Sequence, residues 1–277
     1  MGKTTLNIKI LYNDMGNAEK KIADFLMKNP SGILPLSITE LAEKCGGSEA
    51  TIVRFAKRLG FDGYQQLKIS LAQEENVPSI GADISKEDDA ATVFSKVCDD
   101  IYCSLEKTKK ALSPKNLEKA CQAILNAKDI LLFGLGNSAS VALDAAHKFF
   151  RLGLSAHAYT DNHMQVIAAA HTDEKCVVIG FSHSGSSKDI VQALELAKAQ
   201  NATTIAVTNY GKSPIDKVSD VILSTVSDET NYSILGLKSR IASLAIVDAI
   251  YSWLVCHLSA SSEKINETES ALQRKKY

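Results

Sequence analysis

The chain has 277 residues, of which 45% are hydrophobic, and its 31 basic and 32 acidic side chains leave a net charge of −1. This length and apolar content are enough for one large domain or for two ordinary domains with buried cores. Because the charges balance, the composition excludes a polycationic nucleic-acid-binding protein and gives no global attraction to a membrane. Any basic patch has to be local.

The 6 cysteines are scattered along the chain, and no two of them have C-x-x-C spacing. The N-terminal residues Met-Gly-Lys-Thr-Thr lack the apolar core of a signal peptide. Reduced thiols of this kind are typical of cytoplasmic proteins. We therefore expect a cytoplasmic protein without disulfides.

A helix-turn-helix motif is predicted between residues 37 and 60. Ser37 and Glu40 have the spacing of a capping box, which predicts the start of a first helix. A glycine pair at 46–47 turns the chain, Ser48 suits the N-cap of a second helix, and Gly60 ends it. Two helices joined by a glycine turn also occur in proteins that do not bind DNA. The polar face of the second helix decides between the two interpretations.

That polar face is basic. When the apolar residues of the second helix are turned inward, the residues left facing water are Glu49, Thr51, Arg54, Lys57 and Arg58. A local surplus of positive charge on such a helix predicts contact with the major groove of DNA. Small polar residues at its start suit base edges or phosphates, and the later basic residues suit phosphates. The predicted DNA-contacting residues are Ser48, Thr51, Arg54, Lys57, Arg58 and Lys68.

The run from Ser48 to Lys68 resembles the signature of the RpiR family of bacterial transcription regulators. That family joins an N-terminal helix-turn-helix to a C-terminal sugar-isomerase-type (SIS) domain that binds phosphosugars, and the likeness covers nearly the whole chain. The resemblance implies a helix-turn-helix domain over residues 1–76 and an SIS domain over residues 113–277. Between them, residues 77–112 form a linker and a connecting helix, because the helical pattern lapses from Glu75 to Asp89 and returns from Ala90 to Leu112.

Beyond residue 114 the sequence alternates between apolar strand patterns and helical patterns. This alternation predicts an α/β fold with a doubly wound parallel sheet and helices on both of its faces. Ligands of such sheets bind outside the carboxyl ends of the strands. The predicted strands are 130–133, 154–159, 176–181, 203–207 and 221–225, and helices are expected over 138–152 and 189–200.

The loop after the third predicted strand favours an anion site. The apolar run 177–181 breaks into Ser182-His183-Ser184-Gly185-Ser186-Ser187, and a helical pattern follows. Backbone N–H groups and the dipole at a helix N-terminus attract an anion, and hydroxyl groups add further donors. A tight turn that uses serine and glycine only for its geometry is the alternative interpretation.

The loop after the first predicted strand has two interpretations. Gly134-x-Gly136-x-x-Ala139 fits a relaxed dinucleotide-binding fingerprint, which would make the protein a redox-sensing regulator. The SIS resemblance instead implies that both loops enclose a sugar phosphate, and we favour this reading because it also accounts for the serine loop. In the SIS pattern, Ser184, Ser186 and Ser187 hold the phosphate. The remaining ligand-binding residues, which contact the sugar or close the site, are Gly136, Asn137, Ser138, Ser182 and Gly185.

An SIS isomerase needs a carboxylate base and usually a ring-opening histidine, for which Glu229 and either His163 or His183 are available. A ligand site read by an attached DNA-binding domain needs no catalysis, so we expect a regulator rather than an enzyme. An SIS isomerase with an accessory helical domain stays the alternative. We expect no cofactor, and no metal site, because His163 and His171 lack a third ligand at suitable spacing.

A long apolar helix is predicted from Leu235 to Leu258. It approaches the length of a membrane span, but Lys238, Arg240 and Asp248 interrupt it, so we expect a helix that is buried or faces another subunit. The polar end, residues 259–277, is expected to fray. Because helix-turn-helix proteins gain affinity by pairing half-sites, we expect a homo-oligomer, a dimer or tetramer, whose partners are operator DNA and a sugar phosphate.

Overall fold

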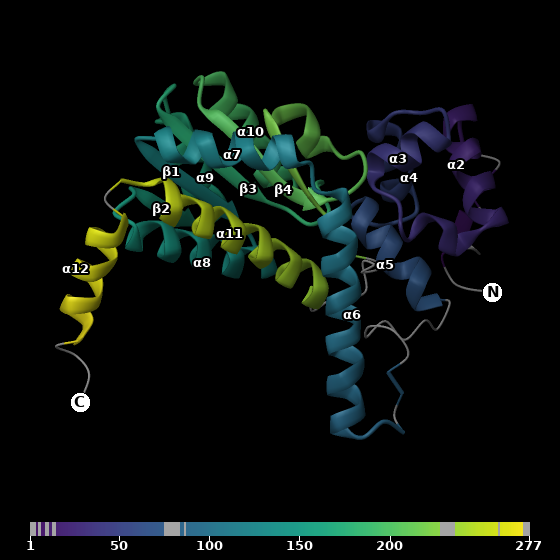
Figure 1. The fold of residues 1–277 in the computed structure, drawn as a ribbon. Helices are drawn as coiled ribbons and strands as arrows, with labels where there is room; N and C mark the ends of the chain where they lie inside the picture. The colour runs from purple at the N-terminus through teal and green to yellow at the C-terminus, as the bar shows by residue number, and fades with distance from the viewer. Residues whose placement is uncertain are drawn as a thin grey trace. The chain divides into compact units, whose positions relative to one another are not determined.

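The computed structural model describes residues 4, 7–8, 11–12, 15–74, 84–85, 87–227, 236–259 and 261–273. The chain divides into two compact units, and one division falls after Asp100, inside helix α6 (Ala90–Ala111). Residues 211–214 are grouped with the first unit. Figure 1 shows the helical unit in purple and blue and the unit built around a sheet in teal, green and yellow. The domain boundaries given above stay predictions.

The first unit is a cluster of short helices around one apolar core. Ser37 caps α3 by accepting a hydrogen bond from the Glu40 N–H, and Ser48 caps α4 in the same way from the Thr51 N–H. Both caps agree with the sequence analysis. The core side chains that are least exposed include Leu41, Ile52 and Phe55. The elements are α2 (Asn17–Lys28), η2 (Pro30–Ile33), α3 (Ile38–Lys44), α4 (Glu49–Arg58) and α5 (Tyr64–Glu74).

The second unit contains a five-stranded parallel sheet with the order β2-β1-β3-β4-β5. The apolar runs in the sequence form strands because parallel strands are buried on both faces, and β3 is buried over its whole length. The predicted doubly wound α/β fold is confirmed. The strands are β1 (Asp129–Gly134), β2 (Ala156–Tyr159), β3 (Cys176–Phe181), β4 (Thr203–Asn209) and β5 (Val221–Thr225).

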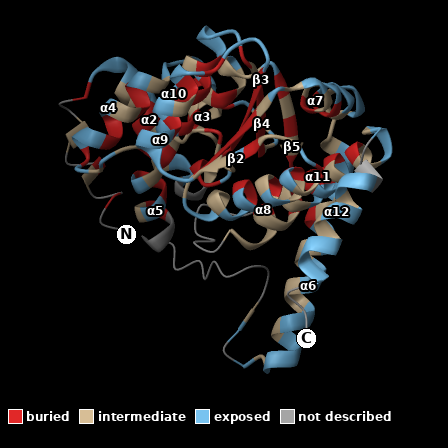
Figure 2. Ribbon diagram, turned by 90° about the vertical axis from the view of Figure 1, so that its left-hand side faces the viewer, coloured by how far each residue is buried: buried red, intermediate tan, exposed pale blue. Residues whose placement is uncertain are grey.

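Helices cover both faces of this sheet, as Figures 1 and 2 show. One face packs against α7, α8 and α11, with Phe149 and Ile250 in the shared core. The other face packs against α9 and α10, with Ala169 and Leu194 in a second core. The helices are α7 (Pro114–Asn126), α8 (Asn137–Arg151), α9 (Asn162–Ala170), α10 (Lys188–Ala199), η3 (Pro214–Val218), α11 (Leu237–His257) and α12 (Ser261–Gln273).

The strand order places a topological switch point between β1 and β3. From β1 the chain goes to β2 on one side and then returns to β3 on the other side. The connections therefore diverge at the carboxyl ends of β1 and β3, which leaves a crevice where ligands of such sheets bind. Both loops singled out in the sequence start at this point.

The C-terminal end differs from the prediction. Instead of fraying, residues 261–273 form α12, which packs on α8 and α11. An ion pair between Arg151 and Glu269 joins α12 to α8. These tertiary contacts stabilise a polar segment whose local pattern gives no strong helix signal.

Candidate functional site

The serine loop leaves β3 in a fixed conformation. The Ser182 N–H donates to the Val207 carbonyl at 3.1 Å, which continues the ladder between β3 and β4 by one residue. The Gly185 N–H donates back to the Ser182 carbonyl at 3.0 Å. Gly185 has a φ of +60°, a left-handed conformation that favours glycine. The loop is therefore a hydrogen-bonded turn with a rigid base.

The hydroxyl groups of this loop form hydrogen bonds within the loop, with one another and with its backbone. The Ser182 hydroxyl donates to Ser187 Oγ at 3.3 Å, and the Ser186 N–H donates to Ser184 Oγ at 3.2 Å. Ser187 is the N-cap of α10, yet its side chain accepts no capping hydrogen bond. The first-turn N–H groups of α10 therefore have no side-chain acceptor from the N-cap, and an anion can take that place.

The first loop turns tightly from β1 into α8. Gly136 occupies the N-cap position with a φ of +55° and supplies no side-chain cap. A Cβ atom on Gly134 would lie 2.4 Å from the Ser138 carbonyl oxygen, so only glycine allows α8 to start this close to β1. These two backbone requirements account for the glycines without a dinucleotide. Asn137 and Ser138 occupy the first turn of α8.

The sheet register brings the two loops to one edge. Gly134, the last residue of β1, pairs with Phe181, the last residue of β3. Because the paired strands are parallel and end together, the residues that follow them leave from adjacent positions. The structure thus assembles the predicted ligand-binding residues from both loops at the switch point: Gly136, Asn137, Ser138, Ser182, Ser184, Gly185, Ser186 and Ser187.

Gln165, on α9, lies at the same edge and was missed in the sequence. Its side chain is fully buried, and its Nε2 donates to the Tyr159 carbonyl at 2.8 Å and to the Gly134 carbonyl at 3.4 Å. The amide therefore joins the ends of β1 and β2, while its buried Oε1 accepts no hydrogen bond within the described residues. A glutamine inside the apolar run Met-Gln-Val-Ile-Ala was the available signal.

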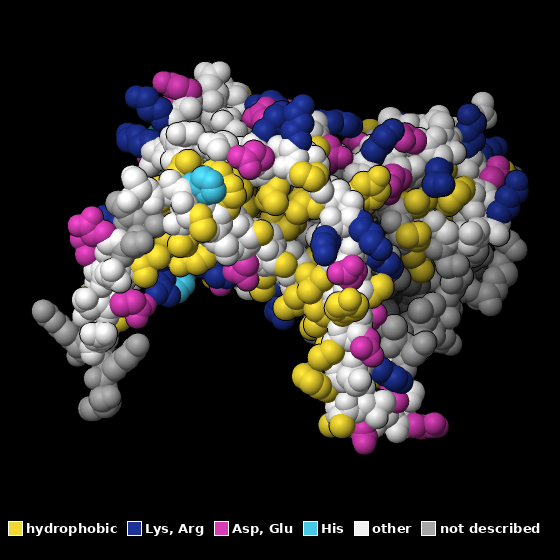
Figure 3. Space-filling model, in the orientation of Figure 1, with side chains coloured by type: hydrophobic (Ala, Val, Ile, Leu, Met, Phe, Trp, Pro, Cys, Tyr) yellow, Lys and Arg dark blue, Asp and Glu magenta, His cyan; other side chains and the backbone are white. Residues whose placement is uncertain are grey.

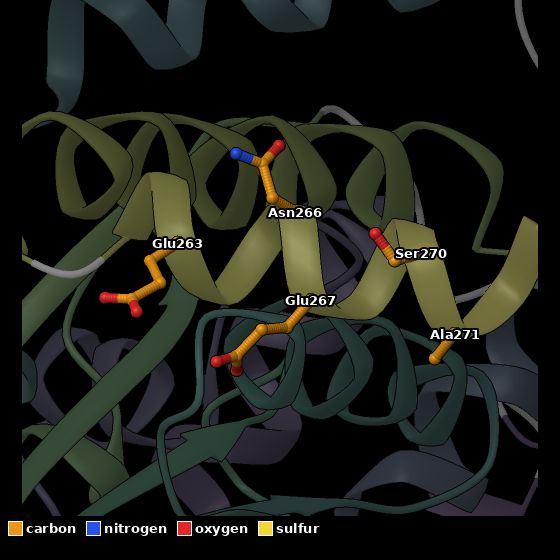
Figure 4. Close-up of a pocket in the computed structure, with 5 residues that line it drawn as sticks. All are labelled: Glu263, Asn266, Glu267, Ser270 and Ala271. Atoms are coloured by element: carbon orange, nitrogen blue, oxygen red, sulfur yellow. The ribbon is translucent and has the colours of Figure 1, made fainter.

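Two cavities in the described part of the chain lie away from these loops. One of about 380 Å³ lies between β2 and α9 and reaches the first residues of β1 and β3, Asp129 and Cys176. Another is open to solvent along α12, where Glu263 and Glu267 extend from the helix (Figure 4). Among the described residues, no group of three His, Cys, Asp or Glu side chains has the arrangement of a metal site. Glu229 lies outside the described residues.

The start of α4 differs from the prediction at Thr51. This side chain is only 6% exposed, and its hydroxyl lies 2.9 Å from the Ser48 hydroxyl. Thr51 precedes Phe55 by four residues, so both lie on the face of α4 that packs inward. The expectation that Thr51 faces water was therefore wrong, whereas Ser48 is exposed.

The basic residues of α4 are exposed as predicted. Arg54, Lys57 and Arg58 all face solvent. Arg58 also forms an ion pair with Glu19 of α2, with 3.2 Å between Nε and Oε1. Arg58 is therefore already partly neutralised, which distinguishes it from Lys57.

Lys68 also differs from the prediction, because its side chain is buried. It is only 3% exposed, and its Nζ donates to the Leu36 carbonyl at 2.6 Å. Burial lowers the pKa of Lys68 to about 7, and the nearby Glu40 carboxylate opposes this shift. A buried ammonium that is bonded to the protein backbone is not placed as a phosphate contact.

Both parts of the chain match known protein families. The family model described as "Helix-turn-helix domain, rpiR family" matches residues 3–77, and the model described as "SIS domain" matches residues 123–252. An uncharacterized HTH-type transcriptional regulator of Caldanaerobacter subterraneus is 36% identical over 88% of this chain and 87% of its own. The HTH-type transcriptional regulator HexR of Pseudomonas aeruginosa is 33% identical over 88% of this chain and 86% of its own.

Among solved structures, the Vibrio vulnificus NanR protein complexed with ManNAc-6P has a TM-score of 0.86. It is 21% identical in sequence, with 99% of this chain and all of that chain covered. The sugar isomerase domain of an RpiR transcription factor from Sphaerobacter thermophilus has a TM-score of 0.57 over 66% of this chain. These structures share the fold of the chain.

Proposed function

Because the chain belongs to the RpiR family of helix-turn-helix transcriptional regulators, we propose that a phosphorylated sugar at the switch point controls its affinity for operator DNA. The single observation that carries the ligand proposal is the pair of loops at the carboxyl ends of β1 and β3. Their hydroxyl groups and the uncapped start of α10 suit a phosphate held mainly by neutral donors.

The class of ligand is supported by a relative of the same fold. Vibrio vulnificus NanR was solved with ManNAc-6P, a phosphorylated amino sugar. In this chain, Ser184, Ser186 and Ser187 are proposed to hold the phosphate. The backbone at Gly136 and the side chains of Asn137, Ser138 and Ser182 are proposed to contact or enclose the sugar.

The DNA-binding surface is proposed to be the exposed side of α4. Ser48, at its N-cap, suits a base edge or phosphate, and Arg54, Lys57 and Arg58 suit phosphates. Thr51 and Lys68 act from inside the unit rather than on DNA, since both side chains are buried.

We propose that the protein acts as an oligomer. Helix α11 is the one helix among the described residues that is long and apolar enough to cross a membrane, yet only 33% of its most apolar window is buried. On the same side of the sheet, α8 exposes Leu143 and Phe150, at 55% and 68%. Figure 3 shows apolar side chains gathered over this part of the second unit. Self-association would cover them, as expected for a cytoplasmic regulator.

The relatives are named transcriptional regulators, and we infer that the chain regulates without catalysis. The test combines two measurements on the full chain. A thermal-shift panel of sugar phosphates, unphosphorylated sugars and nicotinamide dinucleotides identifies the ligand class, since a ligand at 100 times its Kd adds about 2.7 kcal/mol of stability. Isomerase assays on each stabilising sugar phosphate follow. Stabilisation by dinucleotides alone, or rapid sugar turnover, would contradict the proposal.

A further inference from the structure

Helix α5 places two hydrogen-bond donors on one backbone carbonyl. Tyr64 and Lys68 are four residues apart, so they lie on the same face of α5. The Tyr64 hydroxyl donates to the Leu36 carbonyl at 2.8 Å, and Lys68 Nζ donates to the same oxygen at 2.6 Å. A carbonyl oxygen has two lone pairs, and both are used here.

The two side chains also contact each other inside the core. Tyr64 is 4% exposed and Lys68 is 3% exposed, and the ammonium lies 5.3 Å from the centre of the Tyr64 ring. Burial raises the pKa of Tyr64, so its phenol stays protonated and continues to donate. Polar groups are costly to bury unless they are hydrogen-bonded, which makes this arrangement specific rather than incidental.

The carbonyl that they hold lies at the entrance to the helix-turn-helix. Leu36 directly precedes Ser37, the N-cap of α3. The Ser37 N–H donates to Glu40 Oε2 at 2.8 Å, and the Glu40 N–H donates to Ser37 Oγ at 3.1 Å. The position of the Leu36 carbonyl therefore determines where the first turn of α3 begins. Helix α3 in turn packs against α4.

We propose that Lys68 and Tyr64 are positioning residues for DNA recognition, which set the placement of α3 and α4 by holding the Leu36 carbonyl. This inference rests on the proposed function of α4. Base-edge contacts depend on the exact placement of a recognition helix, because hydrogen bonds weaken steeply with distance and angle. Charge attraction to phosphates is less sensitive to small displacements. Loss of the hydrogen bonds from Tyr64 and Lys68 to the Leu36 carbonyl therefore affects operator recognition more than general DNA binding.

The test uses the full chain and an operator that the wild-type protein selects from a random DNA pool. Lys68→Met keeps the buried aliphatic stem and removes the donor, and Tyr64→Phe keeps the ring and removes the hydroxyl. Lys28→Met, on an exposed lysine of α2, is the matched control. For each variant, affinity is measured on the operator and on a scrambled duplex over a series of salt concentrations, below the melting temperature of that variant.

We expect Lys68→Met to weaken operator binding about tenfold, which is the size of one lost base-edge contact, with scrambled-DNA affinity and its salt dependence unchanged. Tyr64→Phe should act in the same direction, and the double variant should lose less than the product of the two, because both donors act on one carbonyl. Operator affinity within twofold of wild type in both variants would overturn the proposal. An equal loss on both duplexes, with the salt slope lowered by about 1, would instead make Lys68 a phosphate contact.

Two further outcomes are informative. If Lys68→Met does not fold, the operator affinity of Tyr64→Phe alone tests the positioning role, since this variant leaves the buried lysine in place. If the wild-type chain selects no DNA from the pool, the proposed function fails and the inference fails with it. If the wild type binds its operator and the variants match it, only the inference fails.

Discussion

The hydroxyl of Ser182 donates to the hydroxyl of Ser187 across the serine loop, with 3.3 Å between the oxygens. Ser182 is buried and directly follows the last residue of β3, and Ser187 is the N-cap of α10. The hydrogen bond therefore fixes the start of the helix relative to the end of the strand. The phosphate that we propose at the helix N-terminus would meet hydroxyl donors that are already in position, which would lower the ordering cost of binding.

Removal of these donors should weaken ligand binding selectively. Ser184→Ala and Ser187→Ala each remove a hydroxyl group that is proposed to contact a charged oxygen, and such a hydrogen bond contributes about 1.5–3 kcal/mol. We expect calorimetry to show at least about a tenfold loss of affinity for the stabilising sugar phosphate. Ser270→Ala, on an exposed position of α12, is the matched control and should bind as wild type. Equal affinity of the wild type for the sugar and its phosphate would contradict the phosphate site.

The ion pair between Arg58 and Glu19 predicts unequal contributions along α4. Arg58→Ala should weaken non-specific DNA binding less than Lys57→Ala, because Arg58 is already paired at 3.2 Å. Glu19→Gln should tighten DNA binding, since it removes the negative charge that is paired with Arg58 and keeps a side-chain oxygen for the Gly16 N–H at the start of α2. Loss of one phosphate contact lowers the slope of log K against log salt by about 1. Filter-binding or anisotropy titrations at several salt concentrations measure both the DNA affinity and its salt slope.

The triple variant Arg54/Lys57/Arg58→Ala tests the whole surface. If this variant keeps its melting temperature and binds the selected operator as tightly as wild type, then α4 is not the helix that contacts DNA.

Most of the fold could be predicted from the sequence because its signals are local. The apolar run before Ser182 and the capping box at Ser37 are complete within a few residues, and both elements formed as expected. Two buried polar residues of the first unit, Thr51 and Lys68, were harder to place from the sequence. Thr51 could have been placed inward from its spacing to Phe55, whereas burial of Lys68 depends on a carbonyl at Leu36, 32 residues away.

At the proposed ligand site, too, local features could be predicted from the sequence and contacts between distant segments could not. The glycines and serines of the two loops follow their strands directly, so the strand prediction places them. Gln165 joins Gly134 to Tyr159 through its side chain, and that contact depends on how α9 packs over the strand ends. Helix α12 likewise packs on α8 and α11, and its Glu269 forms an ion pair with Arg151 of α8. Contacts between segments distant in sequence carry no local signal.

Titration of Lys68 should change stability above neutral pH. The pKa of Lys68 is about 7 in the folded chain, whereas an unperturbed lysine has about 10.4. Between these values the unfolded chain holds a proton that the folded chain has released, so the free energy of unfolding rises with pH. The slope has an upper limit of about 1.4 kcal/mol per pH unit, is half of this limit at pH 7 and vanishes at lower pH.

Denaturant unfolding of the first unit at pH 7, 8 and 9 measures this effect. The difference in unfolding free energy between wild type and Lys68→Met should shift in favour of wild type as the pH rises. The difference between wild type and Lys28→Met should stay constant. Parallel curves for wild type and Lys68→Met would mean that the Leu36 carbonyl and the Tyr64 ring keep the ammonium charged throughout this range.

Coupling between the two domains is the last prediction. A regulator of this kind requires that ligand binding changes operator affinity, and coupling free energies between sites are typically about 1–3 kcal/mol. We expect the sugar phosphate to change operator affinity about 5-fold to 150-fold. By thermodynamic linkage, saturating operator has to change sugar-phosphate affinity by the same factor. Operator titrations with and without ligand, and calorimetric ligand titrations with and without operator, measure the two factors independently.

Ser184→Ala should bind operator as wild type does, yet lose the response at ligand concentrations that saturate wild type. If ligand binds and operator affinity does not change, or if the two factors disagree, the proposed control of DNA binding by the sugar phosphate is wrong.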